Sequence, residues 1–188
     1  MEDNSTEKYT GNKVKKSSSL KEWIKDILIA LVIAIIVLQF IKPTIVKESS
    51  MEPTLYENNY ILLNRQAYAF DEPNRGDIIV FKSEILDKNG NKKWLIKRIV
   101  GIPGDVITIA NGKVQINGKL FEEDYLKDGV TDGELIGYEV PSDEYFVMGD
   151  NRLVSLDSRY DEVGTVEKDR ITGKAFFRLY PVGEFGVI

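Results

Sequence analysis

The sequence predicts a mainly β domain of antiparallel strands behind a single N-terminal transmembrane helix. Three observations support this fold class: segment 20–42 is largely apolar and long enough to cross a bilayer, short β-branched runs follow it, and Asn-Gly pairs separate several of those runs. A chain of 188 residues suits one modest domain plus an anchor. We therefore expect a tail (1–19), an anchor helix (20–42) and a β domain (43–188).

The N-terminal tail and the apolar segment have different compositions. Residues 1–19 are polar and offer little that could be buried in a core, so we expect a disordered tail. From Trp23 to Ile41 the chain has 19 residues, close to the ~20 that a bilayer core requires. A cleavable signal peptide and a buried core helix are the alternatives. The residues after the apolar segment are too bulky for a small-x-small cleavage site, which favours an uncleaved anchor.

Lysines are unevenly distributed around the apolar segment. Lys13, Lys15, Lys16 and Lys21 closely precede it, whereas only Lys42 and Lys47 closely follow it. The positive-inside rule therefore predicts a cytoplasmic N-terminus and an extracytoplasmic β domain in the cell membrane.

Strand and turn signals occupy most of the predicted β domain. The expected strands are Tyr60–Asn64, Asp77–Lys82, Val106–Ile109, Lys113–Ile116, Tyr145–Met148 and Gly173–Tyr180. Hairpin turns are expected at Asn89-Gly90, Asn111-Gly112 and Asn117-Gly118, and the arrangement is expected to be a meander. Segment 122–139 is rich in acidic residues and glycine, so we expect an exposed excursion rather than core.

The absence of histidine and cysteine from the sequence limits its possible chemistry. It excludes a Ser/His/Asp triad and a thiol mechanism. A serine hydroxyl needs a base beside it, and lysine can supply one when burial lowers its pKa. Ser50 is our candidate nucleophile.

Lys97 is the candidate base, because it lies within the apolar run Trp94–Gly101. Side chains alternate along a strand, so Lys97 and Arg98 point to opposite faces, and one of them shares a face with Leu95 and Ile99. The alternative is an edge strand with both cations in solvent, and this stretch alone does not decide between the two.

Four motifs follow the apolar segment in a fixed order: Ser50–Leu55 (SMEPTL), Arg75–Phe81 (RGDIIVF), Lys97–Asp105 (KRIVGIPGD) and Gly149–Arg159 (GDNRLVSLDSR). In order and spacing they resemble the type I signal peptidases, and the short spacers resemble the compact Gram-positive type. The resemblance covers roughly residues 20–181. It implies a membrane-anchored serine endopeptidase that removes signal peptides from secreted preproteins after small-x-small sites.

The resemblance also implies roles for individual residues. Ser50 would be the nucleophile and Lys97 the general base, with Ser155 orienting the lysine. Asp157 and Arg159 would form a structural ion pair near the site. Candidates for the substrate pocket are Met51, Leu95 and Ile96, and no cofactor or metal is implied.

One position departs from the family pattern. Some members place a serine or threonine two residues before the nucleophile as an oxyanion donor, but this chain has Glu48 there. An ionised carboxylate cannot donate a hydrogen bond. The backbone N–H of Ser50 is then the one assured donor, and a second must come from backbone or water.

The charge of the β domain bears on its partners. Residues 49–188 contain 17 basic and 24 acidic side chains, a net charge of −7, which argues against nucleic acid. The expected partners are preproteins and membrane lipid, and the oligomeric state is open.

Two alternative functions remain. A Ser/Lys self-cleaving repressor domain would carry a DNA-binding module where this chain has its apolar segment. A membrane-anchored binding module or inactive relative is the non-enzymatic alternative, and retention of both Ser50 and Lys97 speaks against it.

Overall fold

A computed structural model describes residues 20–188, and the expected tail, 1–19, lies outside the described residues. The chain divides into two units between Val37 and Leu38. Helix α1 (Leu20–Phe40) begins in the first unit, and its last residues belong to the second. Over residues 20–188, α1 is the one helix long and apolar enough to cross a membrane.

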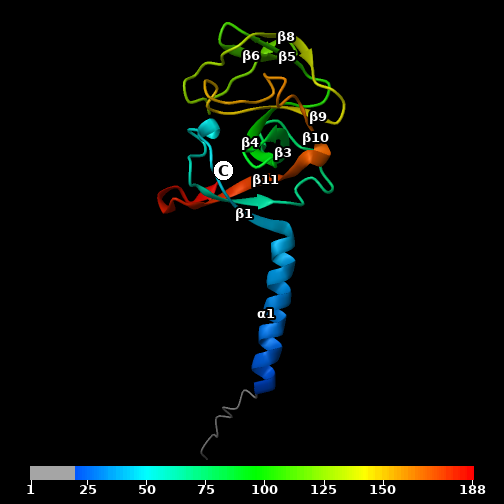
Figure 1. Ribbon diagram of the computed structural model, residues 1–188, viewed down its shortest axis with the longest axis vertical. Coiled ribbons are helices and arrows are strands. Elements are labelled where there is room, and N and C mark those ends of the chain that lie inside the picture. Colours follow the sequence, from blue (N-terminus) through cyan, green and yellow to red (C-terminus); the bar gives the residue numbers. More distant parts are fainter. Residues whose placement is uncertain (1–19) are drawn as a thin grey trace, which may run out of the picture. The chain divides into compact units, whose positions relative to one another are not determined.

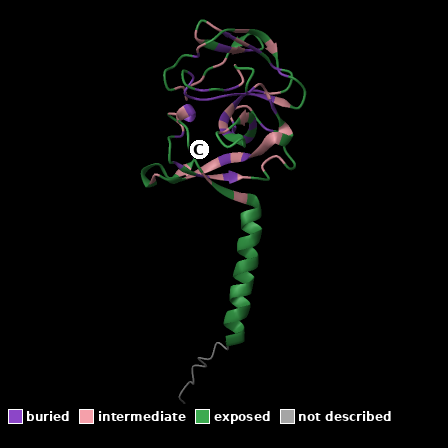
Figure 2. Cartoon of the chain, in the orientation of Figure 1, coloured by how far each residue is buried: buried purple, intermediate pink, exposed green. Residues whose placement is uncertain are grey.

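Helix α1 is exposed along its whole length. Its 21 residues correspond to roughly 32 Å, enough for a bilayer core. None of them is buried (Figure 2), which excludes the core-helix alternative. The helix ends at Phe40, two residues before the predicted end, and strand β1 (Ile41–Ile45) follows directly. The reason is Pro43, which disfavours helical geometry at Lys42.

The larger sheet contains eight strands, all antiparallel to their neighbours. Its order is β1, β2 (Tyr60–Asn64), β11 (Ile171–Tyr180), β3 (Ile78–Leu86), β4 (Lys92–Gly101), β9 (Glu144–Met148) and β10 (Val166–Glu167), with β12 (Gly186–Val187) paired to β11. Three short 3-10 helices lie between strands: η1 (Ser49–Met51), η2 (Lys168–Arg170) and η3 (Val182–Glu184).

The smaller sheet lies at one end of the β domain (Figure 1). Its order is β7 (Lys119–Leu120), β6 (Lys113–Ile116), β5 (Val106–Ala110) and β8 (Leu135–Glu139). Asn111 and Gly112 link β5 to β6 with φ values of 52° and 74°. A tight hairpin needs positive φ at both central residues, which is why the Asn-Gly pair predicts this turn correctly.

Strand alternation divides the core into separate clusters. Ile78 and Val80 of β3 face one cluster, while Ile79 and Phe81 face another. A third cluster lies between β5, β6 and the ends of β4 and β9. Both faces of the central strands are therefore buried, as Figure 2 shows.

The mainly β fold agrees with the prediction, but two details of it do not. The larger sheet is no simple meander, because β11 lies between β2 and β3. Segment 122–139 is more than an exposed excursion: it contains β8, and Thr131 within it is 1% exposed. Its charges are partly neutralised by arginines from a later loop, a pairing that composition does not reveal.

Candidate active site

The turn that carries Ser50 is fixed through its carbonyl groups. Ser50 lies in η1 and is 8% exposed. The backbone N–H of Asn151 donates to the Ser50 carbonyl at 3.0 Å, and its side-chain Nδ2 donates to Ser49 O at 3.2 Å. Leu55 N donates to Met51 O at 2.8 Å and closes the turn. The loop after β9 thus holds the serine's backbone in place.

Lys97 projects from the middle of β4 toward this turn. It is 1% exposed and alternates with the half-buried Ile96 and Arg98, on the same face as the buried Leu95 and Ile99. Its Nζ donates to Ser50 Oγ at 2.7 Å. The structure therefore brings together two residues 47 positions apart, and the solvent-exposed alternative for Lys97 is wrong.

The surroundings of Lys97 favour a neutral amine. Burial lowers the pKa of Lys97 below the usual 10.5 and is the largest effect. Asp157, Glu48 and Asp150 act in the opposite direction and raise it, and the positive charge of Arg159 adds a lowering smaller than any of these. Two of these carboxylates are paired elsewhere, Asp157 with Arg159 at 2.8 Å and Asp150 with Arg98 at 2.7 Å. This pairing weakens their hold on the ammonium form.

Asp157 and Arg159 form the ion pair that the resemblance implies. Arg159 Nε donates to Asp157 Oδ1 at 2.8 Å, and Asp157 Oδ2 accepts the backbone N–H of Gly149 at 3.0 Å. Ser155 is also buried, but its Oγ has no hydrogen-bond partner among residues 20–188. The implied hydrogen bond from Ser155 to Lys97 is therefore not formed in this structure.

Gly149 is a site residue whose individual importance sequence reasoning missed. A Cβ added there would overlap both the Ser155 Oγ and the Ser50 carbonyl oxygen. Only glycine lets the loop approach the nucleophile this closely. The Gly-Asp-Asn sequence was the available signal, but it suggested only a turn.

A groove of about 600 Å³ opens beside Ser50. Met51 and Ile96 line it, as predicted for a substrate pocket, and so does Glu48. Leu95 does not line it: because neighbours alternate along a strand, Leu95 packs on the opposite face against the cluster that contains Ile79. The prediction that Leu95 lines the substrate pocket is therefore wrong.

Two strand edges border this groove. Strand β1 stands at one end of the strand order of the larger sheet. Residues 92–96 of β4 pair with β3 on one side, and the pairing of β4 with β9 on its other side begins only at Arg98. Residues of both strands line the groove. An extended peptide could hydrogen-bond along such edges.

Known proteins are similar to this chain over most of its length. The family model described as "Signal peptidase, peptidase S26" matches residues 20–180. The chain belongs to this signal peptidase family. Signal peptidase I of Bacillus amyloliquefaciens is 37% identical over 182 residues, covering 92% of this chain and 94% of the relative. Signal peptidase I S of Bacillus subtilis strain 168 is 37% identical over 182 residues, covering 91% and 95%.

A solved structure was also found among the similar proteins. The crystal structure of a signal peptidase I from Enterococcus faecalis V583 is 32% identical, with a TM-score of 0.46, and covers 55% of this chain and 97% of that one. The sequence matches confirm the predicted type I signal peptidase family.

This signal peptidase homologue contains a buried ion pair that composition did not suggest. Arg152, 1% exposed, pairs with Glu123 and also bonds Thr131 Oγ1. Both partners belong to the acidic segment 122–139. The pair therefore connects that segment to the loop that holds the Ser50 carbonyl.

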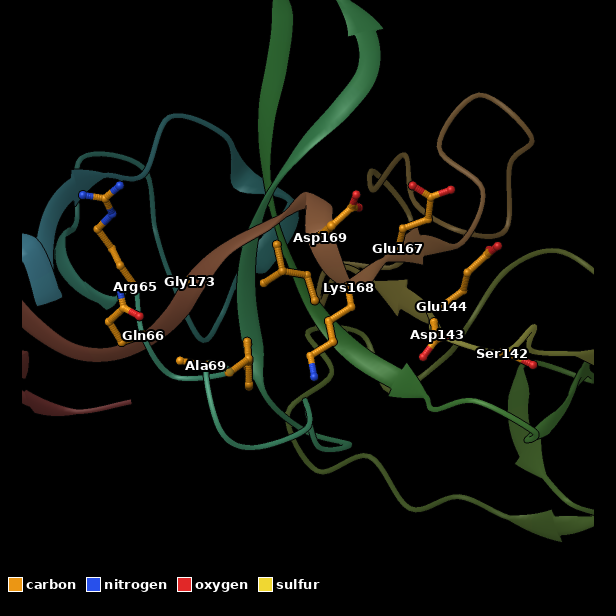
Figure 3. Close-up of a pocket in the computed structure, with 12 residues that line it drawn as sticks. Arg65, Gln66, Ala69, Ser142, Asp143, Glu144, Glu167, Lys168, Asp169 and Gly173 are labelled. Atoms are coloured by element: carbon orange, nitrogen blue, oxygen red, sulfur yellow. The ribbon is translucent and has the colours of Figure 1, made fainter.

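Figure 3 shows another hollow in the signal peptidase homologue, of about 810 Å³, and none of the predicted site residues lines it. Its lining includes Lys168 and the acidic side chains Asp143, Glu144, Glu167 and Asp169. Ser142 also lines this hollow, but the Lys168 Nζ donates to Glu72 Oε1 at 2.6 Å rather than to that serine. The chemistry of the groove beside Ser50, rather than cavity size, identifies that groove as the candidate site.

Proposed function

We propose that this chain is a membrane-anchored serine endopeptidase that removes signal peptides from secreted preproteins. The observation that carries the proposal is the 2.7 Å hydrogen bond between Lys97 Nζ and Ser50 Oγ in a site where both side chains are buried. The names of the relatives, signal peptidase I and signal peptidase I S, support the substrate class.

The proposed reaction begins with a neutral Lys97. Ser50 Oγ attacks the scissile carbonyl, and its proton passes to Lys97 Nζ, which then gives it to the departing amine as the C–N bond breaks. Lys97 Nζ then takes a proton from a water molecule, whose oxygen attacks the ester carbonyl, and returns this proton to Ser50 Oγ as the ester C–O bond breaks. At the reference pKa only roughly 1 lysine in 2,500 is neutral at pH 7. The burial of Lys97 is therefore essential to the mechanism.

The developing oxyanion needs a donor close to Ser50. The Ser50 backbone N–H lies in the first turn of η1, where N–H groups have no partner within the helix. Glu48 precedes η1 with extended backbone angles (φ −130°, ψ 152°) and makes no side-chain capping bond. We assign Glu48 no donor role.

The proposed substrate is an extended chain that lies in the groove between β1 and β4. Met51 and Ile96 would contact its small side chains, which accounts for small-x-small specificity. Helix α1 would remain in the membrane as an uncleaved anchor, with residues 1–19 cytoplasmic and the β domain, which follows it, extracytoplasmic. The site would then meet preproteins as they leave the membrane.

Cleavage of a purified preprotein in detergent tests the proposal. The parent chain should release the mature protein with its new N-terminus after a small-x-small sequence, and Ser50→Ala should not. Mass spectrometry of the product identifies the bond that is cut. Equal cleavage by Ser50→Ala, or a cut elsewhere, would refute the proposed function.

A further inference from the structure

Thr54 lies four residues after Ser50, at the other end of the same tight turn. It is half-buried, in the turn that follows η1. Its Oγ1 donates to Asp150 Oδ2 and accepts a hydrogen bond from Arg98 Nη2 at 3.3 Å. The Thr54 hydroxyl thus acts both as a hydrogen-bond donor and as an acceptor.

The two partners of Thr54 are sequence neighbours of the residues that contact Ser50. Arg98 follows Lys97, whose Nζ bonds Ser50 Oγ at 2.7 Å. Asp150 precedes Asn151, whose N–H bonds the Ser50 carbonyl at 3.0 Å. The Thr54 hydroxyl therefore joins the nucleophile turn to the two segments that meet at Ser50.

Arg98 and Asp150 also bond each other directly. Arg98 Nε donates to Asp150 Oδ1 at 2.9 Å and Nη2 to Oδ2 at 2.7 Å, a two-bond arrangement that fixes both side chains. Arg98 Nη1 also donates to Gly76 O at 3.0 Å. Loss of the Thr54 hydroxyl should thus leave the ion pair and the β4 strand in place and release only the turn.

The turn has a second attachment at the same residue. Arg178 of β11 donates from Nη2 to the Thr54 carbonyl oxygen at 3.0 Å. This bond uses the backbone and survives a change of side chain. A Thr54 variant should therefore shift the turn rather than unfold it.

We propose that Thr54 is a positioning residue that sets the distance between Ser50 Oγ and Lys97 Nζ. The inference rests on the proposed function, because it concerns the rate of the same reaction. A displacement of about 1 Å between reacting groups can reduce a rate by roughly 100-fold. Thr54 touches neither substrate nor reacting atoms, so its effect should appear in kcat rather than in KM.

Three variants test the role of Thr54. Thr54→Val removes the hydroxyl and keeps the shape, and Thr54→Ser restores the hydroxyl. Thr165→Val is the matched control, since Thr165 Oγ1 donates to the Glu144 carboxylate near the β10 edge of the sheet. For each, kcat and KM for preprotein cleavage and the melting temperature are measured in detergent.

We expect the kcat of Thr54→Val to fall by at least about 10-fold. Its KM should stay within about twofold of the parent value, and its melting temperature should be no lower than that of Thr165→Val. Thr54→Ser should recover most of the lost kcat. A smaller loss of kcat in Thr54→Val, a loss seen only in KM, or no recovery in Thr54→Ser would overturn the inference. If Thr54→Val does not fold, Thr54→Ala replaces it, and failure of both to fold assigns Thr54 a structural role and overturns the positioning role.

The proposed function and this inference fail in different ways. Ser50→Ala, assayed beside the Thr54 variants, reports on the reaction itself. An inactive Ser50→Ala with an unimpaired Thr54→Val would remove only the inference. An active Ser50→Ala would remove the proposed function as well.

Discussion

Lys97 is a buried amine, which is one of the two placements that the strand pattern alone leaves open, and the sequence describes its environment only in part. The apolar run around it indicates burial, which is the largest cause of its lowered pKa. Arg98 shows the limit of the same reasoning. Alternation sends it to the other face, but there it bonds a carboxylate that is 0% exposed. Arg98→Ala would therefore leave a buried charge unpaired and cannot serve as a neutral control.

Replacement of Lys97 by methionine tests the energetic cost of its burial. Because the pKa of Lys97 is lowered in the folded state, folded protein binds the lysine proton less tightly than unfolded protein does. The free energy of unfolding of the parent therefore rises with pH between the folded-state pKa of Lys97 and about 10.5. At pH 7, Lys97→Met should be inactive and more stable by about 0.5–2 kcal/mol. Urea unfolding at pH 7 and pH 10 measures this difference, which should shrink at pH 10. A destabilised variant at pH 7 would argue against a costly buried ammonium.

At the scale of elements, hairpins were predictable and long-range contacts were not. The Asn-Gly turns and most strand cores follow from local patterns, and the predicted ranges Tyr60–Asn64 and Lys113–Ile116 match β2 and β6. The insertion of β11 between β2 and β3 depends on pairs of residues that lie 90 (Ile171 and Phe81) to 120 (Tyr180 and Tyr60) positions apart, which local patterns do not encode. The motif Gly149–Arg159 is visible in the sequence, but the Asn151 bonds to Ser49 and Ser50 are not.

The close approach of this loop to the nucleophile can be tested at Gly149. Gly149→Ala places a methyl group against the Ser50 carbonyl and Ser155, so either the loop or the nucleophile turn must move. We expect a loss of kcat of roughly 100-fold. Preprotein cleavage by Gly149→Ala is compared with that by Gly183→Ala, because Gly183 has open space around its Cβ position. Near-parent activity in Gly149→Ala would mean that the loop does not fix Ser50.

At the scale of the whole molecule, the chain combines a helix able to cross a bilayer with a β domain that contains the Ser50–Lys97 pair. Composition and hydropathy predicted both parts, and the family match covers both, residues 20–180. The helix ended two residues early because Pro43 favours a strand there. The lysine distribution around the helix carries the orientation proposal.

Limited proteolysis of intact cells tests the proposed orientation. A protease added outside should digest the region after Ile41 and leave an epitope tag at the N-terminus protected. The physical reason is the excess of lysines before the helix, which retains that end in the cytoplasm. Permeabilised cells are the control, in which the tag should also be lost. Loss of the tag in intact cells with a protected β domain would reverse the orientation.

The pH dependence of preprotein cleavage, compared between the parent chain and Lys97→Arg, tests the general-base role of Lys97 most directly. For the parent, kcat/KM should rise with pH as the amine loses its proton, with a midpoint below 10.5 because burial lowers the pKa of Lys97. Lys97→Arg should be inactive at every pH, since guanidinium stays protonated. Lys113→Arg, at an exposed position in β6, should follow the parent curve. Cleavage by Lys97→Arg near the parent rate would contradict the account and reassign Lys97 as a structural cation.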